Sequence, residues 1–547
     1  MSNDPAAWRT RIDPVTTAQY RASGAWRDTT IGERLRGLAA RAPDRVIFVD
    51  DVTSLTAADT LDKASKVAWA LCKRGLVPGD VVSFQLPNWH EAALVELACG
   101  LGGFVCNPIV PIYRDAEVGF TLKDCRSRVL FLPEQFRGFD YRAMMARLAS
   151  QCPDLRYTVM VRGPNDDFQA LLNEAGEGDV SLADPDPNHV KLILYTSGTT
   201  STPKGVLHTH NTIDAEIQTF SRYLGLDGDD VVLMPSTVCH ITGYLYGIVM
   251  PVTFGMKAVY MDRWDAPAAA DLIDRHGVTF TIGATPFLKE LVEFAADRKR
   301  PMPSLRLFPC GGAPVPPSTV RMADEALANC IAFRLYGSTE APTVTAGVFE
   351  RAQFHGRAET EGVVVGHEAR LLKSDGTQAA VGEEGEVITK GPEVCVGYAN
   401  WDQNDAFDQD GFFHTGDLGT FDADGCLTIT GRLKDIIIRG GENISSKEVE
   451  DVLHSHSLIS EAAVVAMPHA RLGETCCVFL TLREQVDFSL DDLRAFLAEN
   501  GLAKQKWPEH MVILAELPRT PSGKIRKNVL RDRSRNENLN SSYRSMG

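Results

Sequence analysis

The sequence lacks any hydrophobic run long enough to cross a bilayer. Its longest apolar stretch, residues 244–256, is shorter than the roughly 20 residues that a membrane-spanning helix needs. The opening residues, MSNDPAAWRT, contain no apolar segment of the signal-peptide type. We therefore expect a soluble protein without a transmembrane segment.

Cysteine pairs and excess positive charge are also missing. None of the 12 cysteines forms a C-x-x-C pair, so neither a zinc site nor a disulfide framework is indicated, and a reducing, cytoplasmic compartment is expected. The formal net charge of −16 argues against binding to nucleic acid or to anionic membranes, because both carry charge of the same sign. Any anionic ligand must therefore be held by a local group of donors.

The chain is long enough for more than one domain, since 547 residues exceed what a single core usually organises. Between about residues 80 and 335, short apolar runs alternate with helix-like segments such as 267–276 and 286–298. This alternation is typical of an α/β fold with a largely parallel sheet. From 362 to 388, strand-like runs separated by turn residues indicate a β-subdomain.

The last part of the chain has an α+β pattern. Ser445-x-x-Glu448 and Ser489-x-x-Asp492 have the form of capping boxes that open helices, and the runs EAAVVAMP and CCVFLTL predict strands. We expect a large α/β domain with its β-subdomain, a small α+β domain and a disordered tail, at residues 1–431, 432–535 and 536–547 respectively.

One stretch, YTSGTTSTPKGV at residues 195–206, combines glycine, hydroxyls and lysine directly after an apolar run that predicts a buried strand. Glycine lets backbone N–H groups approach a ligand closely, and hydroxyl and ammonium groups add donors, so the stretch suits phosphate. It departs from the P-loop pattern G-x-x-x-x-G-K-[ST], because Pro203 stands at the second glycine and Gly205 at the Mg²⁺-binding hydroxyl. Composition alone would also allow a flexible linker.

Four further motifs follow this loop in order along the chain. They are LYGSTEAP (335–342), HTGDLG (414–419), GRLKDIIIRGGENI (431–444) and PRTPSGKIRK (518–527). Each is weak alone, but the ordered series resembles the adenylate-forming (ANL) superfamily of acyl-CoA synthetases, adenylation domains and luciferases, over almost the whole chain. The resemblance implies that a carboxylate attacks the α-phosphate of ATP to give an acyl-adenylate and pyrophosphate, and that a thiol then displaces AMP.

The resemblance also implies which residues bind ATP and its Mg²⁺. Glu340 would hold Mg²⁺, Tyr336 would stack on adenine, and Asp417 would accept hydrogen bonds from the ribose hydroxyls, with Arg432 as a second contact. The other nucleotide-binding residues would be Thr196, Ser197, Gly198, Thr199, Thr200, Lys204, Gly312, Ala313, Gly337 and Thr339. Taken singly, Tyr336 is equally typical of a core aromatic residue and Glu340 of a solvated turn.

Residues of the small domain complete the implied site. Lys524, in PSGK, would bridge the attacking carboxylate and the α-phosphate, where it offsets negative charge that accumulates in the transition state. Lys434 falls at the implied hinge, about which the small domain would swing between two poses. The second pose would bring three residues beside the thiol of CoA, namely Gly440, Gly441 and Glu442.

The residues of the implied acyl pocket are apolar or small. The pocket contains His240, Gly243, Gly311 and Leu335, with His240 also a candidate catalytic residue near the thiol tunnel, although a satisfied core histidine is the commoner case. An amino-acid substrate would need a buried acidic partner for its ammonium, so a neutral hydrophobic acid is favoured. The run AQYRASGAWRDTTIGERL also resembles medium-chain and alicyclic (cyclohexanecarboxylate-type) acyl-CoA ligases, which points to fatty acid metabolism.

Several alternatives stay open at this point. A stand-alone adenylating enzyme that loads an aryl or acyl group onto a carrier protein would use the same residues; Arg439 and Lys447 are candidates for binding the 3′-phosphate of CoA. A non-catalytic acyl-nucleotide binder would be expected to lack Lys524 or Glu340, and both are present. A luciferase-like oxygenase has no specific support. The expected partners are a carboxylic acid, ATP and CoA, and the oligomeric state is open, a homodimer included.

Overall fold

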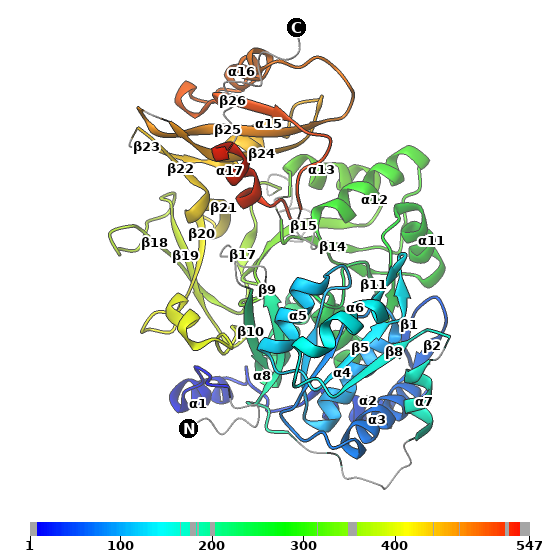
Figure 1. The fold of residues 1–547 in the computed structure, drawn as a ribbon. Coiled ribbons are helices and arrows are strands. Elements are labelled where there is room, and N and C mark those ends of the chain that lie inside the picture. Colours follow the sequence, from blue (N-terminus) through cyan, green and yellow to red (C-terminus); the bar gives the residue numbers. More distant parts are fainter. Residues whose placement is uncertain are drawn as a thin grey trace.

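The computed structural model describes residues 8–164, 166–174, 182, 185–196, 203–313, 315–347, 358–440, 442–469, 471–519 and 524–536. Sheets of six, thirteen and five strands organise these residues (Figure 1). The first two sheets belong to a large lower body and the third to a small upper one (Figure 1). The expected α/β class with a small α+β domain is confirmed.

The six-stranded sheet has the order β10-β9-β4-β3-β5-β8, and only β10 runs antiparallel to its neighbour. Its strands are short apolar runs that are buried on both faces, as parallel strands between helices require. Their bounds are β3 (Val81–Phe84), β4 (Val105–Pro108), β5 (Val129–Pro133), β8 (Tyr157–Val161), β9 (Val190–Thr196) and β10 (Lys204–Thr209).

The thirteen-stranded sheet changes character at β15 (Ile331–Tyr336). On one side β15 pairs in parallel with β14 (Leu307–Cys310), and on the other it pairs antiparallel with β16 (Thr345–Ala346). The remaining strands of the α/β half are β13 (Phe280–Thr281), β11 (Val231–Met234), β12 (Lys257–Tyr260), β1 (Val46–Val49) and β2 (Ser54–Thr56). Those of the β-subdomain are β17 (Gly362–Val364), β21 (Cys426–Arg432), β20 (Phe413–Phe421), β19 (Gly385–Lys390) and β18 (Glu368–Leu372).

Helices cover these sheets, and their ends follow the local sequence. In α11 (Ala266–His276), Asp265 caps the first turn and Gly277, at φ +65°, ends the last. This helix and α12 (Thr285–Arg298) confirm the two helices expected from the sequence. Other helices of the large domain are α1 (Pro14–Ala22), α2 (Ile31–Arg41), α3 (Ala57–Lys73), α4 (His90–Gly102), α5 (Asp115–Asp124), α6 (Tyr141–Leu148), α7 (Asp167–Glu174), α8 (His210–Leu224), α9 (Ile241–Tyr244), α10 (Met250–Phe254) and α13 (Pro317–Ala326).

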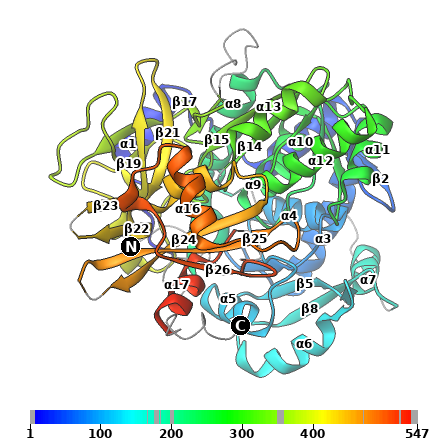
Figure 2. The same cartoon turned by 90° about the horizontal axis from the view of Figure 1, so that it is seen from above.

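The small domain is a separate five-stranded sheet with helices on it. Its strands are β22 (Ile436–Arg439), β23 (Glu442–Ser445), β24 (Ile459–His469), β25 (Gly473–Leu482) and β26 (His510–Ile513), and its helices are α15 (Ser446–Leu453), α16 (Leu490–Glu499) and α17 (Lys527–Asn536). Seen from above, it lies over the middle of the large domain (Figure 2). The thirteen-stranded sheet ends along the chain with β21 at Arg432, and the five-stranded sheet begins with β22 at Ile436. The predicted domain boundary after residue 431 stays a prediction.

The two predicted capping boxes differ in outcome. At α16 the box is complete, because Ser489 and Asp492 bond each other's backbone N–H groups. At α15, Ser445 accepts a hydrogen bond from the N–H of Glu448, but the Glu448 carboxylate pairs with Lys506 instead of returning to Ser445. The capping box predicted at Ser445 and Glu448 is therefore only half formed, because Glu448 pairs with Lys506 and not with the backbone N–H of Ser445.

Among the helices of the described residues, none combines the length and the apolar character that crossing a membrane requires.

Candidate active site

The expected site residues approach one another where the two domains face each other. The ends of β9, β15 and β20 lie near the segment that enters α17 (Figure 1). Direct contacts join Lys204 to Tyr398, Tyr398 to Glu340, Tyr336 to Asp417 and Asp417 to Arg432. We use the name cleft for the region that these contacts define.

The phosphate-loop motif connects two neighbouring antiparallel strands. Thr196 ends β9 and Lys204 begins β10, and the two residues are paired across the ladder. A strand and not a helix follows the loop, which explains physically why the sequence departs from the P-loop pattern, whose phosphates lie at a helix N-terminus. Four of the expected phosphate contacts, Ser197, Gly198, Thr199 and Thr200, lie outside the described residues.

The YGSTE motif forms a tight turn after β15. A Cβ at Gly337 would lie 1.9 Å from the carbonyl oxygen of Pro342, so only glycine fits there. The N–H of Ser338 donates to the carbonyl of Ala341 at 2.8 Å, and the Ser338 hydroxyl accepts from the N–H of Ala341 at 3.1 Å. Thr339 and Glu340 follow one another within this turn.

A histidine that sequence reasoning missed anchors this turn. Nε2 of His208, on β10, donates to the carbonyl of Thr339 at 2.8 Å, and its Nδ1 lies 3.1 Å from the hydroxyl of Thr212. Burial lowers the pKa of His208 to about 4, so the ring is neutral at pH 7 and its donor is fixed on Nε2. No motif signalled this role, because residues 208 and 339 are far apart in the chain.

The HTGDLG motif presents Asp417 toward the cleft. Oδ2 of Asp417 accepts a hydrogen bond from the Tyr336 hydroxyl at 2.8 Å, and Oδ1 pairs with Nε of Arg432, its cross-strand neighbour. Glu386, on β19, holds the motif in place, since its carboxylate accepts from the N–H of Gly416 at 3.1 Å and bonds His414 at 2.9 Å. Burial, and then the charge of Asp417, raise the pKa of Tyr336 well above its usual range.

Lys524 reaches the cleft from the small domain. Part of its side chain is exposed. The protein around its ammonium displaces water and so lowers its pKa, and the charge of Arg432 lowers it further, while the charges of Asp417 and Glu340 raise it. The charge of Lys524 also affects His240: burial, and then the charge of Lys524, lower the pKa of His240 to about 4. The structure therefore brings Lys524 near residues that lie between 92 and 284 positions earlier in the sequence.

The expected thiol-tunnel residues lie elsewhere in this structure. Gly440, at φ +62°, and Glu442 belong to the β22–β23 hairpin, which Figure 1 shows on the outer edge of the small domain, away from the segment that enters α17. Gly441 lies outside the described residues. The implied hinge residue, Lys434, occupies a short 3₁₀ turn (Leu433–Asp435) between the domains, where burial and Arg432 lower its pKa to about 8.

Two of the expected acyl residues, His240 and Gly243, belong to the helical segment that follows β11, and the other two, Gly311 and Leu335, contact each other. His240 is the N-cap of α9, and α9 continues through a π-helical turn (Leu245–Val249) into α10. A Cβ at Gly243 would lie 2.1 Å from the carbonyl oxygen of Thr237, and one at Gly311 would lie 2.6 Å from that of Leu335. Both glycines are thus required by packing, and π turns of this kind are frequent at functional sites.

Sequence reasoning missed a buried carboxylate behind this segment. Glu216, on α8, accepts a hydrogen bond from the Tyr246 hydroxyl at 2.6 Å, and that hydroxyl lies 2.8 Å from the hydroxyl of Thr343. Burial raises the pKa of Glu216 to about 7. Glu216 therefore ties the helical segment to the loop that carries Glu340, three residues before Thr343.

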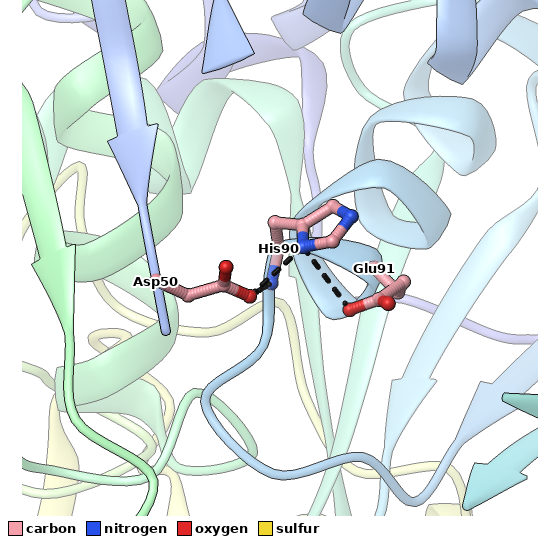
Figure 3. A group of neighbouring side chains, drawn as sticks. All are labelled: Asp50, His90 and Glu91. Atoms are coloured by element: carbon pink, nitrogen blue, oxygen red, sulfur yellow. Dashed lines mark hydrogen bonds and ion pairs between the residues drawn. The ribbon is translucent and has the colours of Figure 1, made fainter. Parts of the chain in front are cut away.

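A second cluster of acidic and imidazole groups lies outside the cleft. Asp50, His90 and Glu91 offer ligand atoms within 4.8 Å of one another (Figure 3). Arg162 already supplies their cation: it pairs with Asp50, bonds Glu91 through Nε at 2.8 Å and Nη2 at 2.9 Å, and stacks over Trp89 at 4.2 Å. Burial alone would raise the pKa of Asp50, but His90 and Arg162 hold it well below its usual range. The group is a structural ion network centred on a guanidinium.

Fold and cleft together define a two-domain adenylate-forming enzyme. The chain belongs to the AMP-binding enzyme family: residues 35–399 match the family model "AMP-binding enzyme", and residues 448–524 match the model of its C-terminal domain.

Two curated relatives illustrate the range within the family. The chain is 34% identical to a medium-chain fatty-acid–CoA ligase of Escherichia coli K12, over 94% of this chain and 92% of that one. It is 32% identical to a salicyl-AMP ligase / salicyl-S-ArCP synthetase of Mycobacterium tuberculosis, with the same two coverages. The relatives thus include enzymes named for CoA and an enzyme named for a carrier.

Two solved structures of one protein resemble this chain. ATP-bound MatB from Rhodopseudomonas palustris is 25% identical, covers 93% of this chain and 99% of its own, and superimposes with a TM-score of 0.84. The apo form of the same protein, with the same two coverages, gives a TM-score of 0.73. The chain therefore superimposes better on the ATP-bound structure than on the apo form.

Proposed function

We propose that the chain is an AMP-forming carboxylic acid–CoA ligase for a neutral hydrophobic acid of the medium-chain, alicyclic or aromatic kind. It converts the acid and ATP to acyl-AMP and pyrophosphate, then transfers the acyl group to CoA and releases AMP. The observation that carries this proposal is that the predicted motifs meet in one region, where direct contacts join Glu340 through Tyr398 to Lys204, and Asp417 to Tyr336 and Arg432.

The carboxylate of Glu340 fits Mg²⁺, because Tyr398 bonds one of its oxygens, Oε1, at 2.8 Å and a monodentate ligand uses only one oxygen. When bound, Mg²⁺ neutralises charge on the polyphosphate of ATP. Lys204 and Thr196, at the two ends of the phosphate loop, hold the β- and γ-phosphates with the loop hydroxyls of Ser197, Thr199 and Thr200.

In the first half-reaction the cleft positions the nucleotide and balances charge. Asp417 and Arg432 bind the ribose, Tyr336 packs on adenine beside Gly312 and Ala313, and Thr339 donates to the α-phosphate from the turn that His208 anchors. The ammonium of Lys524 lies between the acid and the α-phosphate, where it stabilises developing negative charge.

The second half-reaction needs a different pose of the small domain. Rotation about Lys434 moves Lys524 out of the cleft and turns the hairpin with Gly440, Gly441 and Glu442 toward it. The earlier candidates for the CoA phosphate, Arg439 and Lys447, are paired here with Glu509 and Asp451, so either must exchange a partner in order to bind CoA.

The acid is proposed to be apolar because the expected pocket offers it no ionic partner. Gly243, Gly311 and Leu335 pack tightly, and burial keeps His240 neutral at pH 7. Glu216 is a buried carboxylate that bonds Tyr246, and burial raises its pKa to about 7, so it carries only part of a negative charge at neutral pH.

Loading of a carrier protein is the second candidate function. It is favoured by the similarity to a relative named salicyl-S-ArCP synthetase, and it uses the same first half-reaction. The two functions differ only in the thiol that accepts the acyl group.

The test is pyrophosphate release with Mg·ATP across acetate, hexanoate, decanoate, cyclohexanecarboxylate, benzoate and phenylacetate, each with and without CoA. Steady turnover of one hydrophobic acid only with CoA, with AMP and the thioester as products, supports the ligase. Pyrophosphate exchange that CoA never accelerates supports carrier loading. The absence of exchange with every acid, in a folded preparation, would contradict the catalytic assignment of Lys524 and Glu340.

A further inference from the structure

Tyr398 lies between two groups that the proposed function assigns to the polyphosphate. The ammonium of Lys204 stands 4.8 Å from the centroid of its ring, and its hydroxyl donates to Oε1 of Glu340 at 2.8 Å. Only 2% of Tyr398 is exposed, so both contacts are made by a residue that cannot easily change its position. No sequence motif considered above contains this tyrosine.

The backbone around Tyr398 is locked to the strand that begins at Lys204. Leu207 donates to the carbonyl of Gly397 at 2.9 Å, and Ala399 donates to that of Gly205 at 2.8 Å, so residues 396–399 extend the sheet beyond β10. The side chain of Asn404 accepts from the N–H of Tyr398 at 3.0 Å. The ring is therefore held at a fixed offset from Lys204.

The same segment also holds the turn that carries Glu340. The N–H of Cys395 donates to the backbone carbonyl of Glu340 at 2.7 Å. Tyr398, three residues later in the chain, bonds the carboxylate of the same Glu340. Backbone and side chain of Glu340 are thus both fixed from residues 395–398. A glutamate held at both ends keeps one orientation of its carboxylate, which favours binding of a cation that tolerates little distortion of its coordination.

We propose that Tyr398 is a positioning residue that sets the spacing between Lys204 and Glu340. The ring holds the ammonium by a cation–π contact, the hydroxyl holds the carboxylate, and neither group is left to pair with the other. This inference rests on the proposed function, which gives Lys204 to the phosphates of ATP and Glu340 to Mg²⁺.

The two contacts can be separated by two substitutions in the full-length chain. Tyr398→Phe keeps the ring under Lys204 and removes the bond to Glu340, whereas Tyr398→Leu removes both. The measurement is the dissociation constant of ATP by titration calorimetry, without acid, in excess Mg²⁺ and again in EDTA. We expect the phenylalanine variant to lose about tenfold of the Mg²⁺-dependent gain in affinity, as removal of a hydrogen bond to a charged group does, with binding in EDTA unchanged.

The leucine variant should bind ATP more weakly in EDTA as well, because Lys204 loses its ring. Tyr141→Phe is the matched control: Tyr141 is buried and its hydroxyl donates to the carbonyl of Pro111 at 2.7 Å, outside the cleft, so neither titration should change. An unchanged Mg²⁺-dependent gain in Tyr398→Phe, or an equal loss with and without Mg²⁺, would overturn the inference.

A double-mutant cycle keeps the test decisive if Tyr398→Phe lowers the melting temperature. In the Glu340→Gln background the same substitution should no longer change the Mg²⁺-dependent gain, because its target carboxylate is gone; a full additive loss would contradict the inference. The proposed function fails separately: wild-type protein that binds no Mg·ATP contradicts that function, whereas wild-type acyl-AMP formation with a normal Tyr398→Phe titration contradicts only the role of Tyr398.

Discussion

Two clusters of carboxylates and cations in this molecule look alike as lists of residues and differ in where their members come from. Around Arg162, three acidic side chains share one guanidinium inside a single domain. In the cleft, Glu340, Asp417 and Lys524 come from separate motifs and from two domains. A network inside one domain stabilises the fold of that domain, while groups that meet only where two domains approach can also serve a ligand between them.

The largest expected effect separates the two clusters through stability. Arg162→Ala would leave the buried carboxylates of Asp50 and Glu91 without their cation, which we expect to cost about 3 kcal/mol of unfolding free energy. Urea unfolding measures the cost, and calorimetry should show the affinity for Mg·ATP unchanged in protein that remains folded. A stable variant with weakened nucleotide binding would break the comparison.

A smaller effect is expected behind the nucleotide turn. His208→Leu removes the hydrogen bond to the Thr339 carbonyl and leaves that carbonyl buried, so we expect about a tenfold loss of ATP affinity. The readout is the dissociation constant of Mg·ATP. His276→Leu, on α11 and outside the cleft, is the control. If both variants bind Mg·ATP as tightly as the wild type, His208 does not help to hold the nucleotide-binding turn in place.

A third effect concerns Glu216, whose folded-state pKa of about 7 lies above the ordinary carboxyl value of 4.5. A raised carboxyl pKa means that its contribution to stability is complete below about pH 4.5 and is lost as the pH rises through 7. Glu216→Gln cannot titrate, so its unfolding free energy should gain on the wild type between pH 5 and pH 8, by about 2 kcal/mol for a pKa shift of this size. Urea unfolding at the two values checks this, and a gap independent of pH would contradict the assigned protonation.

The sequence was sufficient for whatever depends on local pattern. Apolar runs located β9, β24 and β25, and the helix-like segments located α11 and α12. The ordered motifs pointed to the family that the comparisons confirm. The site residues named from the resemblance stay predictions, although the described ones that concern the nucleotide lie around one cleft.

What the sequence could not provide are partners set by tertiary pairing. Tyr398 reaches Glu340 only because residues 396–399 pair with a strand that begins almost two hundred positions earlier, and His208 meets Thr339 across 131 positions. Glu216 is one of several polar residues on the amphipathic helix α8, and no sequence motif near it marks it as buried or functional. These contacts arise from the way distant elements pack, which no local spacing encodes.

The most direct test of the account is single-turnover formation of acyl-AMP by wild type and Lys524→Ala, with the acid that the substrate panel selects, together with transfer to CoA from preformed acyl-AMP. The account predicts that adenylation slows by on the order of 10²-fold or more, while transfer to CoA keeps its rate because Lys524 leaves the cleft for that step. Adenylation at the wild-type rate in Lys524→Ala would contradict it.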